Sequence, residues 1–170
     1  MTKTVTQIDC PKEWESVDDW DSHRPLLYLA MVNNLEGRPV CEFGSGMGST
    51  NLLRSYCKEN NRTFQSFDTD IEWCDRMNSI YVKDFEDAFP NTFFGILFID
   101  GKPGEDRKDL INLHRFANVI IAHDTEEGAN YVYGMKEVLS TFKYRLDYEP
   151  IGKPRTTAVS NTVDVTKWVQ

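Results

Sequence analysis

The fold of this chain is decided by one stretch, Val40-Cys41-Glu42-Phe43-Gly44-Ser45-Gly46-Met47-Gly48-Ser49-Thr50. It begins as a short apolar run, typical of a buried strand, and continues as a glycine cluster that leads directly into a helical pattern. Glycines at alternate positions permit a tight turn and let a ligand approach the backbone. A dinucleotide-binding turn reads G-x-G-x-x-G, whereas this one reads G-x-G-x-G. Glu42 before the turn favours a ligand with a cationic amine over a pyrophosphate, so an NAD-dependent oxidoreductase is the disfavoured alternative.

Short apolar runs alternate with amphipathic stretches on both sides of this turn. We expect strands at 40–43, 63–67, 80–82, 93–99, 119–122, 144–148 and 156–165. We expect helices at 24–35, 49–60, 71–78, 105–117 and 131–142. This alternation predicts an α/β fold, a Rossmann-like doubly wound three-layer α/β/α sandwich with a mostly parallel sheet and an antiparallel closing strand.

The size and charge of the chain limit what it binds. Its 170 residues predict one domain over 1–170, with an opening helix at 24–35, a cofactor-binding half at 40–90 and an acceptor-side half at 91–170. Nineteen basic and 27 acidic residues give a net charge of −8, which argues against nucleic acid and anionic membranes as partners. Without an apolar run of about 18 residues or a signal peptide, the chain is expected to be cytoplasmic.

A second acidic position follows the next expected strand, in Asp68-Thr69-Asp70. In open α/β sheets ligands bind outside the carboxyl ends of the strands, and a carboxylate there can accept from both hydroxyls of a ribose. A turn that favours a cation, followed by a ribose-binding carboxylate, describes S-adenosylmethionine better than NAD.

With these motifs the chain resembles the class I S-adenosylmethionine-dependent methyltransferases over residues 40–123. The motifs are V-C-E-F-G-S-G-M-G-S-T, F-D-T-D and L-F-I-D-G. The resemblance implies S-adenosylmethionine as the cofactor, its methionine part near the glycine turn, its ribose on Asp68 and its adenine near Asp84. The cofactor-binding residues that it implies are Glu42, Gly44, Gly46, Gly48, Ser49, Thr50, Asp68 and Asp84.

Two further strand ends, Ile99-Asp100-Gly101 and His123-Asp124, resemble those of small-molecule and sugar O-methyltransferases. The resemblance implies that Asp100, His123 and Asp124 are catalytic and deprotonate or orient the acceptor oxygen. It also implies a Mg²⁺ ion on Asp100 and Asp124, although Lys102-Pro103 stands where that subgroup often has a histidine. Without a metal, His123 or Asp124 would be the general base. The alternative for His123 is a strand-end imidazole bonded to a backbone carbonyl.

The expected function is therefore methyl transfer to an oxygen of a small molecule or a sugar. The sequence after Asp100 lacks the [N/D]-P-P-[Y/F] motif of enzymes that methylate nucleic-acid bases. A non-catalytic cofactor-binding module of the same fold is the alternative. Tyr131 and Tyr133 are candidates for the acceptor pocket, and the stretch 156–165 is a candidate for pairing with a second copy in a homodimer. His23 is expected to cap or pack the opening helix.

Overall fold

A computed structural model describes residues 1–34, 37–84, 93–101, 106–111 and 116–169. The strands are β1 Thr2–Val5, β2 Val40–Phe43, β3 Phe64–Asp68, β4 Ile80–Tyr81, β5 Phe94–Ile99, β6 Ala117–Ala122, β7 Tyr144–Tyr148 and β8 Thr156–Ser160. The helices are α1 Arg24–Asn33, α2 Thr50–Glu59, α3 Ile71–Met77, α4 Asp106–Ile111, α5 Asn130–Tyr133 and α6 Met135–Ser140. Short 3₁₀ turns are η1 Lys12–Trp14 and η4 Val165–Trp168.

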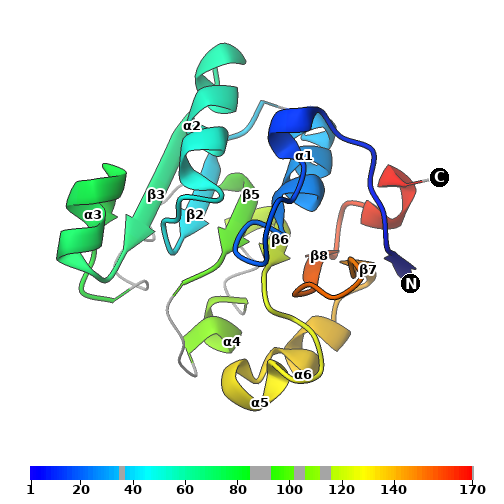
Figure 1. Ribbon diagram of the computed structural model, residues 1–170. Coiled ribbons are helices and arrows are strands. Elements are labelled where there is room, and N and C mark those ends of the chain that lie inside the picture. The colour runs from blue at the N-terminus through cyan, green and yellow to red at the C-terminus, as the bar shows by residue number, and fades with distance from the viewer. Residues whose placement is uncertain (35–36, 85–92, 102–105, 112–115, 170) are drawn as a thin grey trace.

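All eight strands form one sheet in the order β1-β7-β8-β6-β5-β2-β3-β4 (Figure 1). β8 runs antiparallel to both of its neighbours, β6 and β7, and the other pairs are parallel. The expected mostly parallel sheet with an antiparallel closing strand is confirmed.

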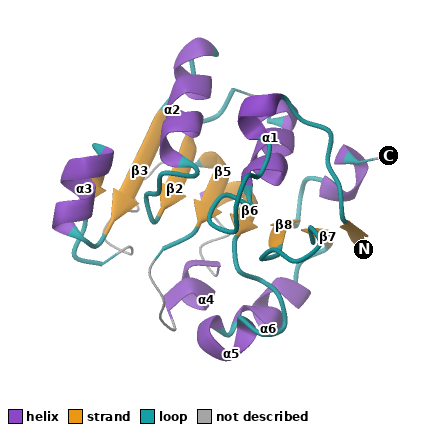
Figure 2. Cartoon of the chain, viewed as in Figure 1, coloured by secondary structure: helices purple, strands orange, loops and turns teal. Residues whose placement is uncertain are grey.

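Helices cover the two faces of this sheet, α1 and α2 on one and α4, α5 and α6 on the other (Figure 2). The central strand β5 is buried throughout and sends alternate side chains into the two cores. Ile96 and Phe98 pack in the core under α1 and α2, whereas Leu97 and Ile99 pack in the core over α4 and α6. The three-layer sandwich is therefore confirmed.

Most elements lie within a few residues of their expected bounds, and larger differences occur at two helices and at the N-terminus. The expected helix at 131–142 is two helices, because Gly134 adopts φ +61° between α5 and α6. The expected helix at 105–117 ends earlier, since Ala117 is already the first residue of β6 and pairs with Phe94. β1 was not expected and adds a parallel edge strand beside β7.

The stretch 156–165 is the candidate for pairing with a second copy, and the homodimer itself stays a prediction. The strand part of this stretch, β8, is bonded on both edges by β6 and β7, so it offers no free edge. The strand stops at Ser160, whose hydroxyl accepts from the backbone N–H groups of Thr162 and Val163 and turns the chain toward η4. Within the described ranges, no helix is long and apolar enough to cross a bilayer.

Candidate functional site

The glycine turn between β2 and α2 lies at the carboxyl edge of the sheet, and each of its glycines has different surroundings. Gly44 adopts φ +87°, and a Cβ atom on it would lie 2.2 Å from the Cα atom of Gly101, so only glycine fits. A Cβ atom on Gly48 would meet the backbone of Trp20 at 3.0 Å and the ring of His23 at 3.2 Å. Gly46 is more open, with its nearest contact at 3.7 Å. Gly46 is thus the glycine beside which a ligand has room.

Glu42 lies beneath this turn and is completely buried. Its carboxylate accepts hydrogen bonds from the hydroxyls of Ser49, Thr50 (2.7 Å) and Ser66 (2.5 Å). The Thr50 hydroxyl in turn accepts from the backbone N–H of Gly46 at 2.8 Å. Burial raises the pKa of Glu42 to about 7, against the lowering effect of the three hydroxyls. Glu42, Ser49 and Thr50 therefore hold the turn onto the sheet, and their contact with a cofactor stays a prediction.

Asp68 ends β3 beside the turn and is also buried. Its carboxylate accepts from the backbone N–H of Ser45 (2.9 Å), the hydroxyl of Ser45 (3.3 Å) and the backbone N–H of Asp70 (3.0 Å). A carboxylate has about four acceptor positions, so these bonds leave one for a ligand. The Ser45 hydroxyl also lies 3.0 Å from the hydroxyl of Ser79 and can turn to it, which frees a second position for a ribose.

Two residues flank the place expected for the adenine. The indole N–H of Trp73 on α3 donates to the carbonyl of Ser45 at 2.5 Å and so braces the turn. Asp84 is exposed and borders 85–92, which lie outside the described residues. Its contact with adenine stays a prediction.

Asp100 and His123 meet at the ends of β5 and β6, next to the glycine turn. The Nδ1 atom of His123 lies 3.1 Å from Oδ1 of Asp100, and its Nε2 atom lies 2.8 Å from the hydroxyl of Ser22. Burial lowers the pKa of His123, but the charge of Asp100, its hydrogen bond and the charge of Asp124 outweigh burial, so the pKa is raised. The side chain of Asp100 is 20% exposed and that of His123 only 5%, so a substrate reaches the carboxylate first. The backbone-carbonyl alternative for His123 does not describe this imidazole.

Arg107 on α4 binds both expected metal ligands. Its guanidinium lies 2.9 Å from Asp124 and 3.5 Å from Asp100, and it also packs 4.0 Å from the ring centre of Tyr133. A cationic side chain thus already compensates the two carboxylates. This arrangement does not fit the Mg²⁺ ion that the resemblance implies between Asp100 and Asp124, since Arg107 already contacts Oδ1 of Asp100 and Oδ2 of Asp124. Lys102 and Pro103 lie outside the described residues.

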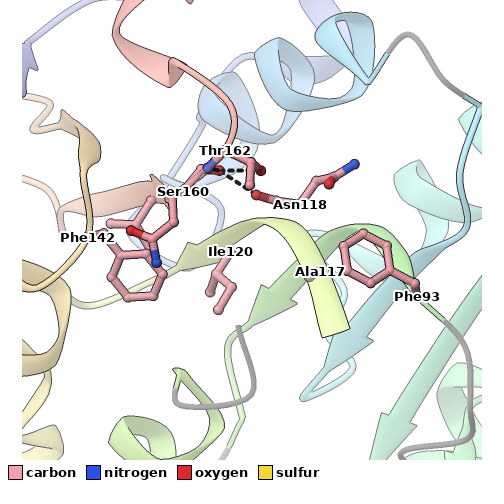
Figure 3. A pocket seen from close by; sticks show the side chains of 9 residues that line it. Phe93, Ala117, Asn118, Ile120, Phe142, Ser160 and Thr162 are labelled. Atoms are coloured by element: carbon pink, nitrogen blue, oxygen red, sulfur yellow. Dashed lines mark hydrogen bonds between the residues drawn. The ribbon is translucent and has the colours of Figure 1, made fainter. Parts of the chain in front are cut away.

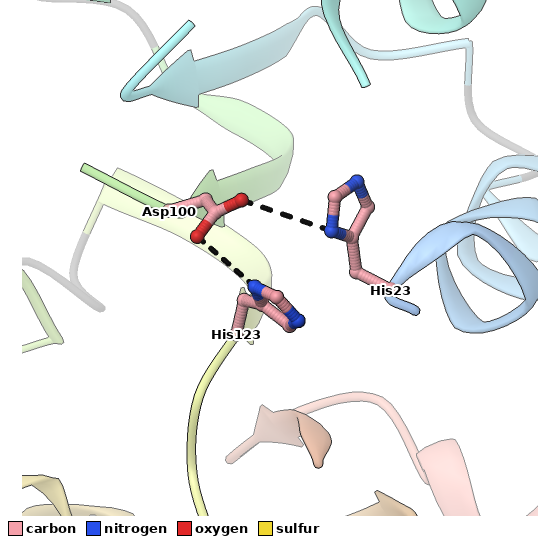
Figure 4. A group of neighbouring side chains, drawn as sticks. All are labelled: His23, Asp100 and His123. Carbon is pink, nitrogen blue, oxygen red and sulfur yellow. Dashed lines mark hydrogen bonds and ion pairs between the residues drawn. The ribbon is translucent and has the colours of Figure 1, made fainter. Parts of the chain in front are cut away.

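Sequence reasoning missed that His23 belongs to this cluster (Figure 4). His23 precedes α1, makes no capping hydrogen bond with its side chain and is 1% exposed. Its ring packs 4.9 Å from the rings of Phe98 and His123, and its Nδ1 atom lies 3.7 Å from Oδ2 of Asp100. Burial lowers its pKa well below the usual value, and the nearby positive charges of His123 and Arg24 lower it further.

The two tyrosines proposed for the acceptor pocket lie in different surroundings. Tyr133 reaches the site through Arg107, whereas Tyr131 is 98% exposed. A separate cavity of about 240 Å³ lies at the opposite edge of the sheet, near the starts of β5 and β6 (Figure 3). It is lined by residues such as Phe93, Ala117 and Phe142, and by none of the expected site residues among the described ones.

Several solved structures share this fold, whereas no protein-family model and no curated protein matches the chain. An O-methyltransferase from Bacillus cereus in complex with SAH has a TM-score of 0.55 and 12% identity over 88% of this chain and 84% of that one. The spermidine synthase from Thermotoga maritima has a TM-score of 0.65 and 16% identity, covering 90% of this chain and 63% of that one. The N-terminal domain of human METTL16 has a TM-score of 0.56 and 11% identity, covering 93% and 76%.

These identities establish the fold and nothing finer. The chain has the fold of the class I S-adenosylmethionine-dependent methyltransferases, as the motifs around Gly44 and Asp100 predicted. The matches do not distinguish the small-molecule O-methyltransferases from other enzymes of this fold, because a spermidine synthase and METTL16 match as well.

Proposed function

We propose that this protein transfers the methyl group of S-adenosylmethionine to a hydroxyl oxygen of a small molecule or a sugar. The observation that carries the proposal is the direct contact between the glycine turn and the end of β5. Gly44 packs against Gly101 so closely that no side chain fits between them. A cofactor on the turn would therefore lie next to Asp100, the residue that precedes Gly101.

The cofactor side of the site has the features that this ligand needs. Gly46 leaves room above the backbone, and Asp68 keeps acceptor capacity for a ribose hydroxyl. The exposed Met47, 76% accessible at the tip of the turn, adds apolar surface beside it. When bound, S-adenosylmethionine would supply a methyl group on a positively charged sulfur, and the sulfur would keep the electrons of the carbon–sulfur bond.

On the acceptor side, Asp100 is the residue that takes the proton. Its carboxylate is the accessible member of the pair, so it accepts the hydroxyl proton while the acceptor oxygen bonds to the methyl carbon. His123 is a positioning residue, because its buried imidazole donates from Nδ1 to Asp100 and fixes the orientation of that carboxylate. Arg107 and Asp124 close the far side of the site through their ion pair.

Cofactor binding is the first test. Calorimetric titration with S-adenosylmethionine and S-adenosylhomocysteine should show saturable binding, with NAD as the negative control. Asp68→Asn removes an ionised acceptor, which is worth about 1.5–3 kcal/mol, so its dissociation constant should rise about 10–100-fold. Asp75→Asn, an exposed carboxylate on α3, is the matched control and should bind as the unmodified protein does.

Catalysis is the second test. With a radiolabelled methyl donor and a panel of hydroxylated acceptors, Asp100→Asn should lower turnover by the about 10²–10⁴-fold that a general base contributes. Asp109→Asn, exposed on α4, serves as the control. No binding of either adenosyl compound would overturn the proposal. Binding without turnover on the whole panel would instead assign the protein to the non-catalytic cofactor-binding class.

A further inference from the structure

The imidazole of His23 is a buried polar group whose contact with the carboxylate of Asp100, at 3.7 Å, is longer than a hydrogen bond. It is 1% exposed, and neither Nδ1 nor Nε2 has a hydrogen-bond partner among the described residues. Such groups are rare in folded proteins and usually indicate an ordered water, an ion or a ligand. An imidazole in its neutral form carries a lone pair on one of its two nitrogens.

His23 lies in a cluster of three side chains whose ligand atoms are close enough to share a metal ion. One ligand atom from each of His23, Asp100 and His123 can be chosen so that all lie within 4.8 Å of one another. Oδ1 of Asp100 lies 3.1 Å from Nδ1 of His123, and Oδ2 lies 3.7 Å from Nδ1 of His23 (Figure 4). Around a tetrahedral ion with bonds of about 2.0–2.2 Å, ligand atoms lie about 3.3–3.6 Å apart. Because Arg107 contacts Oδ1, the ion would take Oδ2 of Asp100. The three ligand atoms lie within 4.8 Å of one another, so the side chains must approach by up to about 1.2 Å to close on an ion.

The outer contacts also suit a ligating imidazole. A metal-bound histidine donates its other ring N–H to an oxygen that fixes its tautomer and orientation. For His123 that oxygen is the hydroxyl of Ser22, 2.8 Å from Nε2, and this hydroxyl donates in turn to the carbonyl of Pro154 at 3.2 Å. Nδ1 of His123, which donates to Asp100 in the metal-free protein, would give up its proton to bind an ion at this place.

We infer that His23, Asp100 and His123 form a binding site for a divalent transition-metal ion of the Zn²⁺ class. Two imidazoles and one carboxylate suit zinc and its neighbours, whereas Mg²⁺ prefers oxygen ligands. Three protein ligands leave a fourth position open, and the exposed side of Asp100 gives it access to a water or a hydroxyl oxygen. The inference is independent of methyl transfer, because the burial and geometry of these side chains carry it.

Metal titration without any adenosyl compound tests this site. Protein treated with a chelator should bind one equivalent of Zn²⁺ by calorimetry, and one equivalent of Co²⁺ should give the visible absorption of a tetrahedral ion. Outer contacts contribute about 10–100-fold to metal affinity, and His23→Leu, which removes a ligand, should weaken Zn²⁺ binding by more than that. Ser22→Ala, which changes only such an outer contact, should weaken it within that range.

Two controls keep the outcome unambiguous. His23→Leu removes a polar group without a hydrogen-bond partner, so in chelator its melting temperature should be no lower than that of the unmodified protein, while added Zn²⁺ should raise only the latter. Asp109→Asn, an exposed carboxylate on α4 outside this cluster, should keep Zn²⁺ binding. Equal Zn²⁺ binding in the unmodified protein and His23→Leu, or loss of binding in Asp109→Asn alone, would overturn the inference. Failure of S-adenosylhomocysteine to bind would leave it untouched.

Discussion

Glu42 offers a sharp test of how the glycine turn is held, because a completely buried carboxylate should make stability depend on pH. Its neighbours are three hydroxyls and no cationic side chain in the described part of the chain, so burial dominates and raises its pKa from 4.5 to about 7. The substitution Glu42→Gln keeps the size and polarity of the side chain and removes its titration.

The sign of the effect follows from proton linkage. A carboxyl group whose pKa is higher in the folded state binds its proton more tightly there, so its contribution to stability is full at low pH. The contribution is lost as the pH rises from the unfolded value, 4.5, through the folded value, about 7. One pKa unit corresponds to about 1.4 kcal/mol, so the loss is about 3 kcal/mol over this window.

The assay is urea-induced unfolding, followed by tryptophan fluorescence at several pH values. Other titrating groups, His23 and His123 included, cancel in the difference between the two proteins. Relative to Glu42→Gln, the unmodified protein should lose about 3 kcal/mol between pH 4.5 and 7 and no more above that. Glu59→Gln, at the exposed end of α2, is the control and should show no such trend. A free-energy difference that stays constant across this window would refute the reasoning.

Three further predictions concern the surroundings of the turn. Gly44→Ala should destabilise the fold by about 2–4 kcal/mol in chemical unfolding, because alanine disfavours φ +87° and its Cβ atom has no room. The control Gly128→Ala has open space around it and should change stability by less than about 1 kcal/mol. Arg107→Lys keeps the charge but loses the planar contact with Tyr133 and the forked hydrogen bonds, so thermal unfolding should show a loss of about 2 kcal/mol. Trp73→Phe removes the hydrogen bond that braces the turn and should weaken S-adenosylhomocysteine binding severalfold in calorimetry, with unchanged secondary structure by circular dichroism.

The fold was predictable because its central strands are buried on both faces and bounded by breaking residues. β2 begins and ends where its short, mostly apolar run does, at Val40–Phe43, and β7 has the expected bounds, Tyr144–Tyr148. The misjudged boundaries have local causes. A helical stripe continues through Gly134 in the sequence, but the left-handed backbone of that residue ends one helix and starts the next. β1 alternates exposed and half-buried residues, so its sequence carries little apolar signal.

The site was predictable to the extent that it lies at strand ends. Asp68, Asp100 and His123 follow apolar runs directly, and parallel strands bring their carboxyl ends to one edge. The partners of these residues could not be predicted in the same way. The ion pair from Arg107 to Asp124 and the three hydroxyls on Glu42 depend on how helices sit over the sheet.

For His23, the position could have been predicted from the topology of the fold, whereas its place in the cluster with Asp100 and His123 could not. The connection from α1 to β2 is short, so the end of α1 must lie near the start of β2, at the amino edge of the sheet. A helix of this length spans about 15 Å, which places its first residue at the opposite edge, beside the glycine turn. His23 therefore had to lie near Asp100 and His123, as the contact of its ring with Gly48 requires. What no periodicity could indicate is that both ring nitrogens are buried without hydrogen-bond partners, since that depends on the side chains of three separate segments meeting in one place.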